Sequence, residues 1–313
     1  MIVAVLLGLG GLAVLTFAAD HLVIGAGRIA ARLRIAPIVV GVVVIGLGTS
    51  APEFLVSGLA AHRGETGLAV GNLVGSNMLN LTLILGVAAL VAPLTVRSSV
   101  PRQEAPLTFA ATALFALSVL LGLGLYVGAA LSLLLVVTSI ALVRLAKAAG
   151  PDPLEAETDE YLAPASHRMR VELTRTVLGL AGTLVGAQIL VVNASTVAVG
   201  LGVSQTAIGF TLVAVGTSLP ELVTAIQAQR RGESDLLVGN LLGSNLFNSL
   251  GGGAVIGLAH AAPESSLVNP WVLVTMMATT AIAWLLMRRG HRVTKPEALL
   301  LIFVYALTLP LLL

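Results

Sequence analysis

The sequence predicts an all-α membrane protein in which ten transmembrane helices form two inverted five-helix repeats. Hydrophobic residues make up 57% of the 313-residue chain and charged residues only 10%, with a mean hydropathy of +1.00. Soluble domains, in contrast, carry about 25% charged residues. Apolar stretches long enough to cross a bilayer as helices, roughly 20 residues each, recur along the whole chain. In addition, residues 41–80 return in the second half as residues 209–248.

The apolar stretches form two groups of five on either side of a single polar segment. This segment, 147–170, is rich in Asp, Glu and Pro and is predicted to be a flexible linker. It separates an N-terminal repeat, 1–146, from a C-terminal repeat, 171–313. The expected spans are 2–27, 36–61, 68–92, 106–123, 125–146, 172–198, 205–229, 236–260, 269–287 and 296–313.

The distribution of basic residues predicts the orientation of the spans. In the ten-span arrangement, 16 of the 17 Lys and Arg residues fall on the side of the central linker, and only Arg63 falls on the other side. Because cytoplasmic loops collect Lys and Arg, we expect a cytoplasmic linker, both termini outside and insertion in the cell membrane. Five is an odd number, so the two halves enter the membrane in opposite directions. Such inverted repeats are typical of transporters that work by alternating access.

The repeated segment carries polar residues that a passive membrane span does not need. The two copies align at a constant offset of 168, and 19 of their 40 positions are identical. The identities include Gly-Thr-Ser, Pro-Glu, Gly-Asn and Gly-Ser-Asn sequences and a final Asn. Polar and ionisable groups are costly inside a bilayer and mark ion or substrate pathways. The duplication therefore predicts a cation site between the two halves of a transporter.

Each copy places a proline and a glutamate directly after its Gly-Thr-Ser sequence. Pro52 and Pro220 have no N–H and would free the carbonyl four residues earlier. Freed carbonyls are tolerated at membrane depth only where they are buried in protein or meet water or ions. Glu53 and Glu221 share a helix face with the Ser and Thr three and four residues before them. We therefore expect broken helices with oxygen ligands around both glutamates.

The following span of each copy adds a polar stripe on one helix face. At intervals of four residues, the stripes contain Asn72, Ser76 and Asn80, and Asn240, Ser244 and Asn248. The stripes and glutamates supply carboxylate, hydroxyl and amide oxygens but no imidazole, and the chain has no Cys. Oxygen-only ligation is used by hard cations such as Ca²⁺ and Na⁺. Two buried carboxylates neutralised either by one divalent ion or by monovalent ions provide the physical basis for exchange at a shared site.

These motifs resemble the two alpha repeats of the Na⁺/Ca²⁺ exchanger family, within the cation/Ca²⁺ exchanger superfamily. The resemblance rests on GTSAPE with GNLVGSNMLN in the first half and GTSLPE with GNLLGSNLFN in the second, and it extends over essentially the whole chain. The short linker is similar to that of prokaryotic members. The resemblance implies a metal site made of Glu53, Glu221, Thr49, Thr217, Ser50, Ser218, Ser76, Ser244, Asn80 and Asn248, with backbone oxygens near Gly46 and Ala214.

The resemblance also implies secondary active antiport by alternating access. It implies exchange of about three Na⁺ for one Ca²⁺ with a net charge movement, and no cofactor. Asn248 occupies the position where K⁺-dependent relatives carry Asp, which implies K⁺ independence. In such a transporter, spans 1 and 6 are the long helices that slide across the core. We also expect helix breaks in spans 2, 3, 7 and 8 around the central ion site.

Two other transport functions remain open. In an H⁺-coupled Ca²⁺ exchanger, the same glutamates would exchange Ca²⁺ for protons, although that group typically has an acidic residue where this chain has Gly75-Ser76-Asn77. A passive cation channel is the second alternative. Enzyme activity is disfavoured because the chain has no HExxH motif, no GxGD pair and no duplicated Ser/His arrangement. Nucleic-acid binding is disfavoured because the basic residues lie mostly between apolar spans. Since the repeats supply a complete pathway in one chain, we expect a monomer surrounded by lipid.

Overall fold

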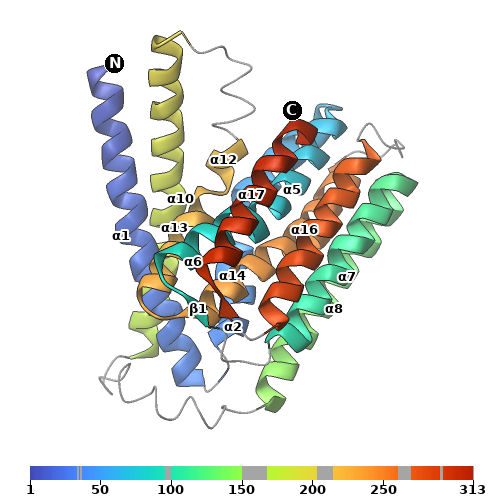
Figure 1. The fold of residues 1–313 in the computed structure, drawn as a ribbon, viewed down its shortest axis with the longest axis horizontal. Coiled ribbons are helices and arrows are strands. Elements are labelled where there is room, and N and C mark those ends of the chain that lie inside the picture. The colour runs from blue at the N-terminus through green and yellow to red at the C-terminus, as the bar shows by residue number, and fades with distance from the viewer. Residues whose placement is uncertain are drawn as a thin grey trace.

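The computed structural model describes residues 1–33, 35, 37–95, 100–149, 168–202, 214–259, 269–289 and 292–312. Nearly all of these residues are helical, as predicted (Figure 1). In chain order the elements are α1 (Ile2–Leu33), α2 (Pro37–Val40), η1 (Gly41–Gly46), α3 (Leu47–Thr49), α4 (Ala51–His62), α5 (Thr66–Leu79), η2 (Asn80–Ile84), α6 (Leu85–Val91), β1 (Leu94–Thr95), α7 (Val100–Leu121), α8 (Leu125–Ala149), α10 (Met169–Gly200), α12 (Ala214–Thr217), α13 (Leu219–Arg230), α14 (Ser234–Phe247), η4 (Asn248–Gly252), α15 (Gly253–Ala259), α16 (Pro270–Arg288), β2 (Arg292–Val293) and α17 (Lys295–Leu312). Most of the predicted linker lies outside the described residues.

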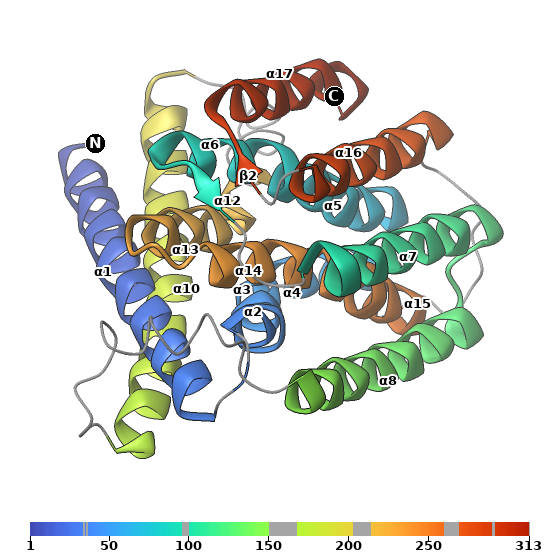
Figure 2. The same cartoon turned by 60° about the horizontal axis from the view of Figure 1, so that its bottom comes forward.

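Two long helices, α1 and α10, run side by side in both views (Figures 1 and 2). Each contains 32 residues. Their backbones approach closely at glycines: a Cβ on Gly186 would lie 2.5 Å from Leu15 N, and one on Gly11 would lie 2.8 Å from Leu190 N. Glycine allows such close helix packing in membranes, where dispersion contacts drive association. These two helices correspond to predicted spans 1 and 6.

Ion pairs hold one end of this helix pair. The carboxylate of Glu172 on α10 lies 3.3 Å from the Arg28 guanidinium of α1 and 2.8 Å from the Arg175 guanidinium. Glu172 is only 1% exposed, and a carboxylate this deeply buried is stable only with such partners. The pairing therefore fixes α1 and α10 to each other near the predicted cytoplasmic side.

A separate ion pair joins α1 to the turn that follows α13. Arg231 donates two hydrogen bonds to Asp20, with N···O distances of 2.6 and 2.7 Å. The hydrogen bonds to Asp20 raise the pKa of Arg231 above its ordinary value, so the guanidinium stays charged. Both side chains are partly exposed, and exposed ion pairs contribute little stability. The contact mainly fixes the position of α1 relative to α13.

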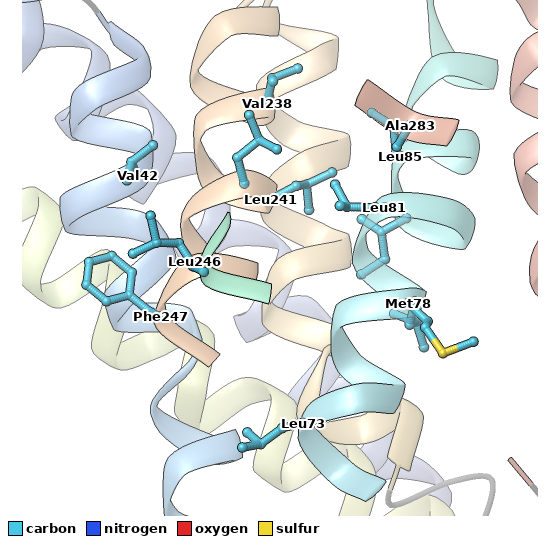
Figure 3. Close-up of a cluster of buried hydrophobic side chains, with 14 of the residues drawn as sticks. Val42, Leu73, Met78, Leu81, Leu85, Val238, Leu241, Leu246, Phe247 and Ala283 are labelled. Atoms are coloured by element: carbon cyan, nitrogen blue, oxygen red, sulfur yellow. The ribbon is translucent and has the colours of Figure 1, made fainter. Parts of the chain in front are cut away.

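Two long helical segments, Thr66–Val91 and Ser234–Ala259, occupy the middle of the fold. In an apolar 18-residue window of Thr66–Val91 and of Ser234–Ala259, 72% and 89% of the residues are buried, against 17% in such a window of Leu125–Arg144 in α8. Figure 3 shows Leu241 of α14 pointing toward Leu81 of η2 within the apolar core. The two copies of the repeated segment therefore contact each other at the centre, with α7, α8, α16 and α17 around them (Figure 2).

The described chain supports a multi-span membrane protein and changes one predicted detail. Seven helices are long and apolar enough to cross a membrane, or eight if the bent segment from η1 to α4 counts as one span. Helix breaks were expected in spans 3 and 8. Instead, Thr66–Val91 and Ser234–Ala259 continue through the π-helical segments η2 and η4. A π-helical turn can be inserted within an α-helix, so both spans continue without a break.

A short antiparallel ladder adds a non-helical contact that the sequence did not predict. Leu94 pairs with Val293 and Thr95 with Arg292, joining β1 after α6 to β2 before α17. Only two residues on each side take part. Strands this short have no periodicity that a sequence pattern could reveal.

The tight turns after α4 and α13 show the repeat in the backbone itself. Gly64 and Gly232, which are equivalent at the offset of 168, have φ values of 78° and 74°. The N–H groups of Glu65 and Glu233 donate to the carbonyls of Ala60 and Ala228, at 2.9 Å in both copies. A left-handed glycine together with a hydrogen bond from an N–H to the carbonyl five residues earlier defines the Schellman motif at a helix C-terminus. Both copies of the motif therefore turn back at the same point.

Candidate cation site

Helix breaks occur at Ser50 and Ser218, in the two spans that contain the glutamates. Ser50 separates α3 from α4 with φ −77° and ψ 0°, and Ser218 separates α12 from α13 with φ −94° and ψ 9°. Pro52 and Pro220 lie in the first turn of the second helix, where the missing N–H costs no helical hydrogen bond. The prolines therefore begin helices rather than interrupt them. In the first copy the two helical parts are bent by 46°.

Both glutamates lie in the first turn of the helix that follows the break. Glu53 belongs to α4 and Glu221 to α13, and both residues are 0% exposed. The first turn of a helix has free backbone N–H groups and a positive dipole end, which stabilise nearby negative charge. The fold thus reduces the cost of two buried carboxylates, and neither forms an ion pair with a basic side chain in the described part of the chain.

Glycine brings the first break close to α14 of the other repeat. A Cβ on Gly46 would lie 2.9 Å from Ser244 N, and a Cβ on Gly243 would lie 2.6 Å from Val42 Cα. Real Cβ atoms essentially never lie within 3.0 Å of such neighbours, so neither position accepts a side chain without backbone movement. As a consequence, Ser244 donates a hydrogen bond to the Gly46 carbonyl at 3.3 Å. The predicted backbone oxygen at Gly46 therefore contacts a predicted site hydroxyl.

Glu53 is held by hydroxyl groups from both repeats. Its Oε1 accepts from Ser76 Oγ of its own repeat at 3.2 Å and from Ser218 Oγ of the other repeat at 3.0 Å. The two hydroxyls also lie 3.0 Å from each other, and Asn248 Nδ2 donates to Ser76 Oγ at 3.3 Å. Thr217 lies beside the same carboxylate. Four other residues predicted from the motif thus gather at the Glu53 carboxylate, Asn248 through Ser76, and Oε2 of Glu53 is left without a hydrogen bond.

The surroundings of Glu221 differ, although the sequence motif is the same. Thr49 and Ser244 lie beside this carboxylate. Thr49, however, donates to the Ile45 carbonyl at 3.0 Å, and Ser244 donates to the Gly46 carbonyl at 3.3 Å. A hydroxyl has only one proton to donate. Both oxygens of Glu221 are therefore left without a hydrogen bond, and the two half-sites are not equivalent.

The first residue of each polar stripe has a different role from the others. Asn72 donates to Ser57 Oγ at 3.0 Å. Asn240 Nδ2 donates to Thr224 Oγ1 at 3.0 Å. Its Oδ1 lies 3.3 Å from the Thr49 hydroxyl, as a second acceptor beside the Ile45 carbonyl for the one Thr49 proton. These contacts join neighbouring helices within and between the repeats. The side-chain oxygen of Asn240 has a partner in the Thr49 hydroxyl, in contrast to the side-chain oxygens of Asn80 and Asn248.

Unpartnered acceptor atoms gather in the predicted site. Among the described residues, nine buried side-chain oxygens have no hydrogen-bond partner, and six of them belong to predicted site residues. These six are Ser50 Oγ, Glu53 Oε2, Glu221 Oε1 and Oε2, Asn80 Oδ1 and Asn248 Oδ1. Ionised carboxylate and amide oxygens only accept hydrogen bonds, and leaving such an atom buried and unpaired costs about 1–3 kcal/mol. A cluster of buried acceptors without donors matches the needs of a cation.

The donor set fits a hard cation. Within the described ranges, no group of three or more His, Cys, Asp or Glu residues could hold a metal ion, so two carboxylates supply the negative charge. Ca²⁺ binds six to eight oxygens at about 2.3–2.6 Å, and this cluster offers carboxylate, amide and hydroxyl oxygens. Ala214 is the first residue of α12, one turn before Thr217. That its backbone oxygen binds an ion is still a prediction.

Sequence reasoning missed a second buried polar cluster next to the site. Asn77 and Asn245 are both 0% exposed, and Asn245 binds Asn80 at 3.0 Å. Asn77 continues to Ser249 at 3.1 Å, and Ser249 lies 3.4 Å from Thr112 on α7. The first two belong to the repeated Gly-Ser-Asn sequences, so their duplication was a usable signal. Ser249 and Thr112 have no equivalent in the motif and could not be predicted from it.

Comparison with known proteins gives a consistent family. Residues 3–146 and 173–313 match the family model of the sodium/calcium exchanger protein. The putative antiporter CaxA of Alkalimonas amylolytica is 36% identical over 97% of both chains. The inner membrane protein YrbG of Escherichia coli (strain K12) is 38% identical, over 79% of this chain and 77% of the relative.

A solved structure shows the same fold. The sodium-calcium exchanger NCX_Mj, soaked with 2.5 mM Na⁺ and 0.1 mM Ca²⁺, superposes with a TM-score of 0.84 at 28% identity. The match covers 99% of this chain and 98% of that structure. The chain therefore belongs to the sodium/calcium exchanger family of membrane antiporters.

Proposed function

We propose that this protein exchanges Na⁺ for Ca²⁺ across the cell membrane at one site shared between Glu53 and Glu221. The observation that carries the proposal is the cluster of six buried, unpartnered oxygens on the predicted site residues. Similarity to NCX_Mj, a sodium-calcium exchanger with 28% identity over nearly the whole chain, supports the choice of these two ions. The proteins of this family transport ions and need no cofactor, and we propose the same for this chain.

The charge of the two carboxylates explains how two different ions can compete for one site. With both ionised, the centre carries two negative charges, because Asn248 contributes a neutral amide where a third carboxylate would add one more. One Ca²⁺ neutralises this charge by itself. Na⁺ ions can neutralise it one at a time, with serine hydroxyls and backbone carbonyls completing their shells. Bilayer insertion penalises unneutralised carboxylates by roughly 2.5–3.5 kcal/mol each, so either cation set is favoured over a bare site.

We further propose that about three Na⁺ exchange for each Ca²⁺ during alternating access. Three monovalent charges moved against one divalent ion transfer one net charge, so transport would respond to voltage. The neutral Asn248 supports K⁺ independence, since a K⁺ ion bound in addition would lack a compensating carboxylate. In this proposal, the ten spans form two inverted repeats, and a single chain is sufficient.

The proposed topology places both termini outside and the linker in the cytoplasm. The bias of 16 basic residues against one supports this orientation. The ion pairs of Glu172 with Arg28 and Arg175 lie on the basic side in this arrangement. The description of one relative as an inner membrane protein is consistent with residence in the cell membrane.

Calcium uptake into proteoliposomes tests the proposal. Vesicles loaded with Na⁺, K⁺, choline or acid would be diluted into ⁴⁵Ca²⁺, with and without valinomycin to set the membrane voltage. We expect uptake only from Na⁺-loaded vesicles, and faster uptake at inside-positive voltage because net positive charge leaves with Na⁺. Adding K⁺ without a voltage change should have no effect.

Each other outcome identifies a different function. Uptake driven by acid-loaded vesicles would establish an H⁺-coupled exchanger that uses the same carboxylates. Uptake without any counter-ion gradient would establish a channel. Uptake driven by Na⁺ but independent of voltage would reject the proposed charge movement and keep the antiport.

A further inference from the structure

The amide of Asn80 has a fixed orientation, and a neighbouring asparagine fixes it. Asn245 Nδ2 donates to the backbone carbonyl of Asn77 at 2.8 Å. A carbonyl oxygen can only accept, so the amide nitrogen of Asn245 must face Asn77. Its amide oxygen then faces the other way and accepts Asn80 Nδ2 at 3.0 Å. As a result, Asn80 turns its nitrogen toward Asn245 and its oxygen away from it.

The side-chain oxygen of Asn80 is one of the six unpartnered oxygens on the residues of the proposed cation site. Asn80 Oδ1 is buried and has no hydrogen-bond partner among the described residues. Asn80 lies one helical turn after Ser76, which donates to Glu53. An amide presents an acceptor to a cation in one orientation and a repelling NH₂ group in the other. The orientation of Asn80 therefore decides whether this residue helps or opposes cation binding.

The repeat equivalent of Asn245 does not act in this way. Asn77 occupies the same position in the first copy and is equally buried. Its Nδ2 donates to Ser249 Oγ at 3.1 Å and to Met276 Sδ at 3.7 Å. Ser249 corresponds to Leu81 in the first copy, so Asn245 meets no similar acceptor. Asn248, the equivalent of Asn80, donates instead to Ser76.

We propose that Asn245 is a positioning residue that holds the Asn80 amide with its oxygen toward the bound cation, a role that its equivalent Asn77 does not share. The proposal rests on the proposed cation site. Asn245 itself does not contact the ion and acts through Asn80. It makes the second repeat responsible for the geometry of a ligand that belongs to the first repeat. The two halves of the site are therefore coupled through a side chain outside it.

The test compares Asn245→Ala with the matched control Asn77→Ala. We expect Asn245→Ala to raise the half-saturating Ca²⁺ concentration about three- to tenfold, the range for one lost hydrogen bond. Its maximal uptake rate should change by less than about twofold, because the carboxylates are unaltered. Asn77→Ala removes a side chain of equal size and burial but leaves the backbone carbonyl that Asn245 binds. It should lower thermal stability and leave the half-saturating Ca²⁺ concentration unchanged.

A double variant distinguishes the positioning of the Asn80 amide by Asn245 from a general weakening of the packing between the two helices. If Asn245 acts only through Asn80, then Asn245→Ala should have no further effect on Ca²⁺ affinity in an Asn80→Ala background. Additive effects, or equal affinity losses in Asn245→Ala and Asn77→Ala, would overturn the proposal. If Asn245→Ala does not fold, Asn245→Ser retains a polar side chain too short to reach Asn80 and carries the same expectation.

Ca²⁺ binding to the purified protein keeps this test separate from the transport proposal. ⁴⁵Ca²⁺ binding in detergent measures the affinity of wild type and variants without any gradient. Wild-type protein that binds Ca²⁺ but shows no Na⁺-driven uptake would contradict the exchange proposal and still report the effect of Asn245. Wild-type exchange with unchanged Ca²⁺ binding in Asn245→Ala would contradict the positioning role alone.

Discussion

Glu53→Gln and Glu221→Gln are each expected to abolish Na⁺-dependent Ca²⁺ uptake while the protein stays folded. Both side chains are fully buried, and each supplies one of the two negative charges in the centre. At a distance of about 2.4 Å, one carboxylate contributes several kcal/mol to the binding of a cation even at an effective dielectric constant of about 20. Gln keeps an oxygen that can accept from Ser76 and Ser218 at position 53. Measuring uptake and thermal melting of both variants checks the two parts of this expectation.

Glu65→Gln is the matched control for the loss of a carboxylate. Glu65 is exposed and precedes α5, outside the cluster of unpartnered oxygens. The control should transport Ca²⁺ at the wild-type rate. Exchange at that rate by Glu53→Gln or Glu221→Gln would remove the glutamate from the site. Unfolding of both variants in detergent would show instead that the carboxylates act mainly in stability.

Gly243→Ala is expected to cause the second large effect, through the close approach of α14 and η1. The added Cβ would lie 2.6 Å from Val42 Cα and 2.7 Å from its carbonyl oxygen. Because backbone atoms cannot rotate away as a side chain does, the two segments must separate by several tenths of an ångström or more. Overpacking of this kind typically costs about 1–3 kcal/mol. The melting temperature should fall, and Ca²⁺ affinity should fall with it because Ser244 and Gly46 lie at the same crossing.

Gly10→Ala provides the control for this substitution. Gly10 lies on the exposed face of α1, and an added Cβ there meets no heavy atom within 4 Å. Alanine also favours a helix over glycine by about 1 kcal/mol. The control variant should therefore be as stable as the wild type or slightly more stable, with unchanged Ca²⁺ affinity. Equal melting temperatures for Gly243→Ala and the wild type would show that the crossing is looser than the structure indicates.

Because the motif is duplicated, the sequence alone indicated which polar residues lie together. Glu53, Ser76 and Ser218 come from three segments distant in the sequence, yet they meet within hydrogen-bond distance. One copy of the motif would have indicated only a polar span. Two copies, each in a half of five predicted spans, indicated repeats of opposite orientation with a site between them. Helix ends at the two serines were likewise predictable from the prolines that follow them.

Other features could not be predicted because they depend on tertiary contacts. The π-helical segments η2 and η4 begin at Asn80 and Asn248, and neither has a local sequence pattern that distinguishes it from an ordinary α-helix. The unequal surroundings of Glu53 and Glu221 arise although the two motifs are alike. They depend on which single acceptor each hydroxyl proton reaches. The orientation of Asn245 depends on a carbonyl in the opposite repeat.

Locating the bound cation tests the central claim most directly. Crystals of the protein grown with Sr²⁺, a Ca²⁺ substitute with a strong anomalous signal, would be compared with crystals soaked in increasing Na⁺. We predict one anomalous peak between the carboxylates of Glu53 and Glu221, within roughly 2.6 Å of oxygens from both repeats, and its loss as Na⁺ rises. A peak bound to only one glutamate, or one that Na⁺ does not displace, would contradict a single site shared by the two ions.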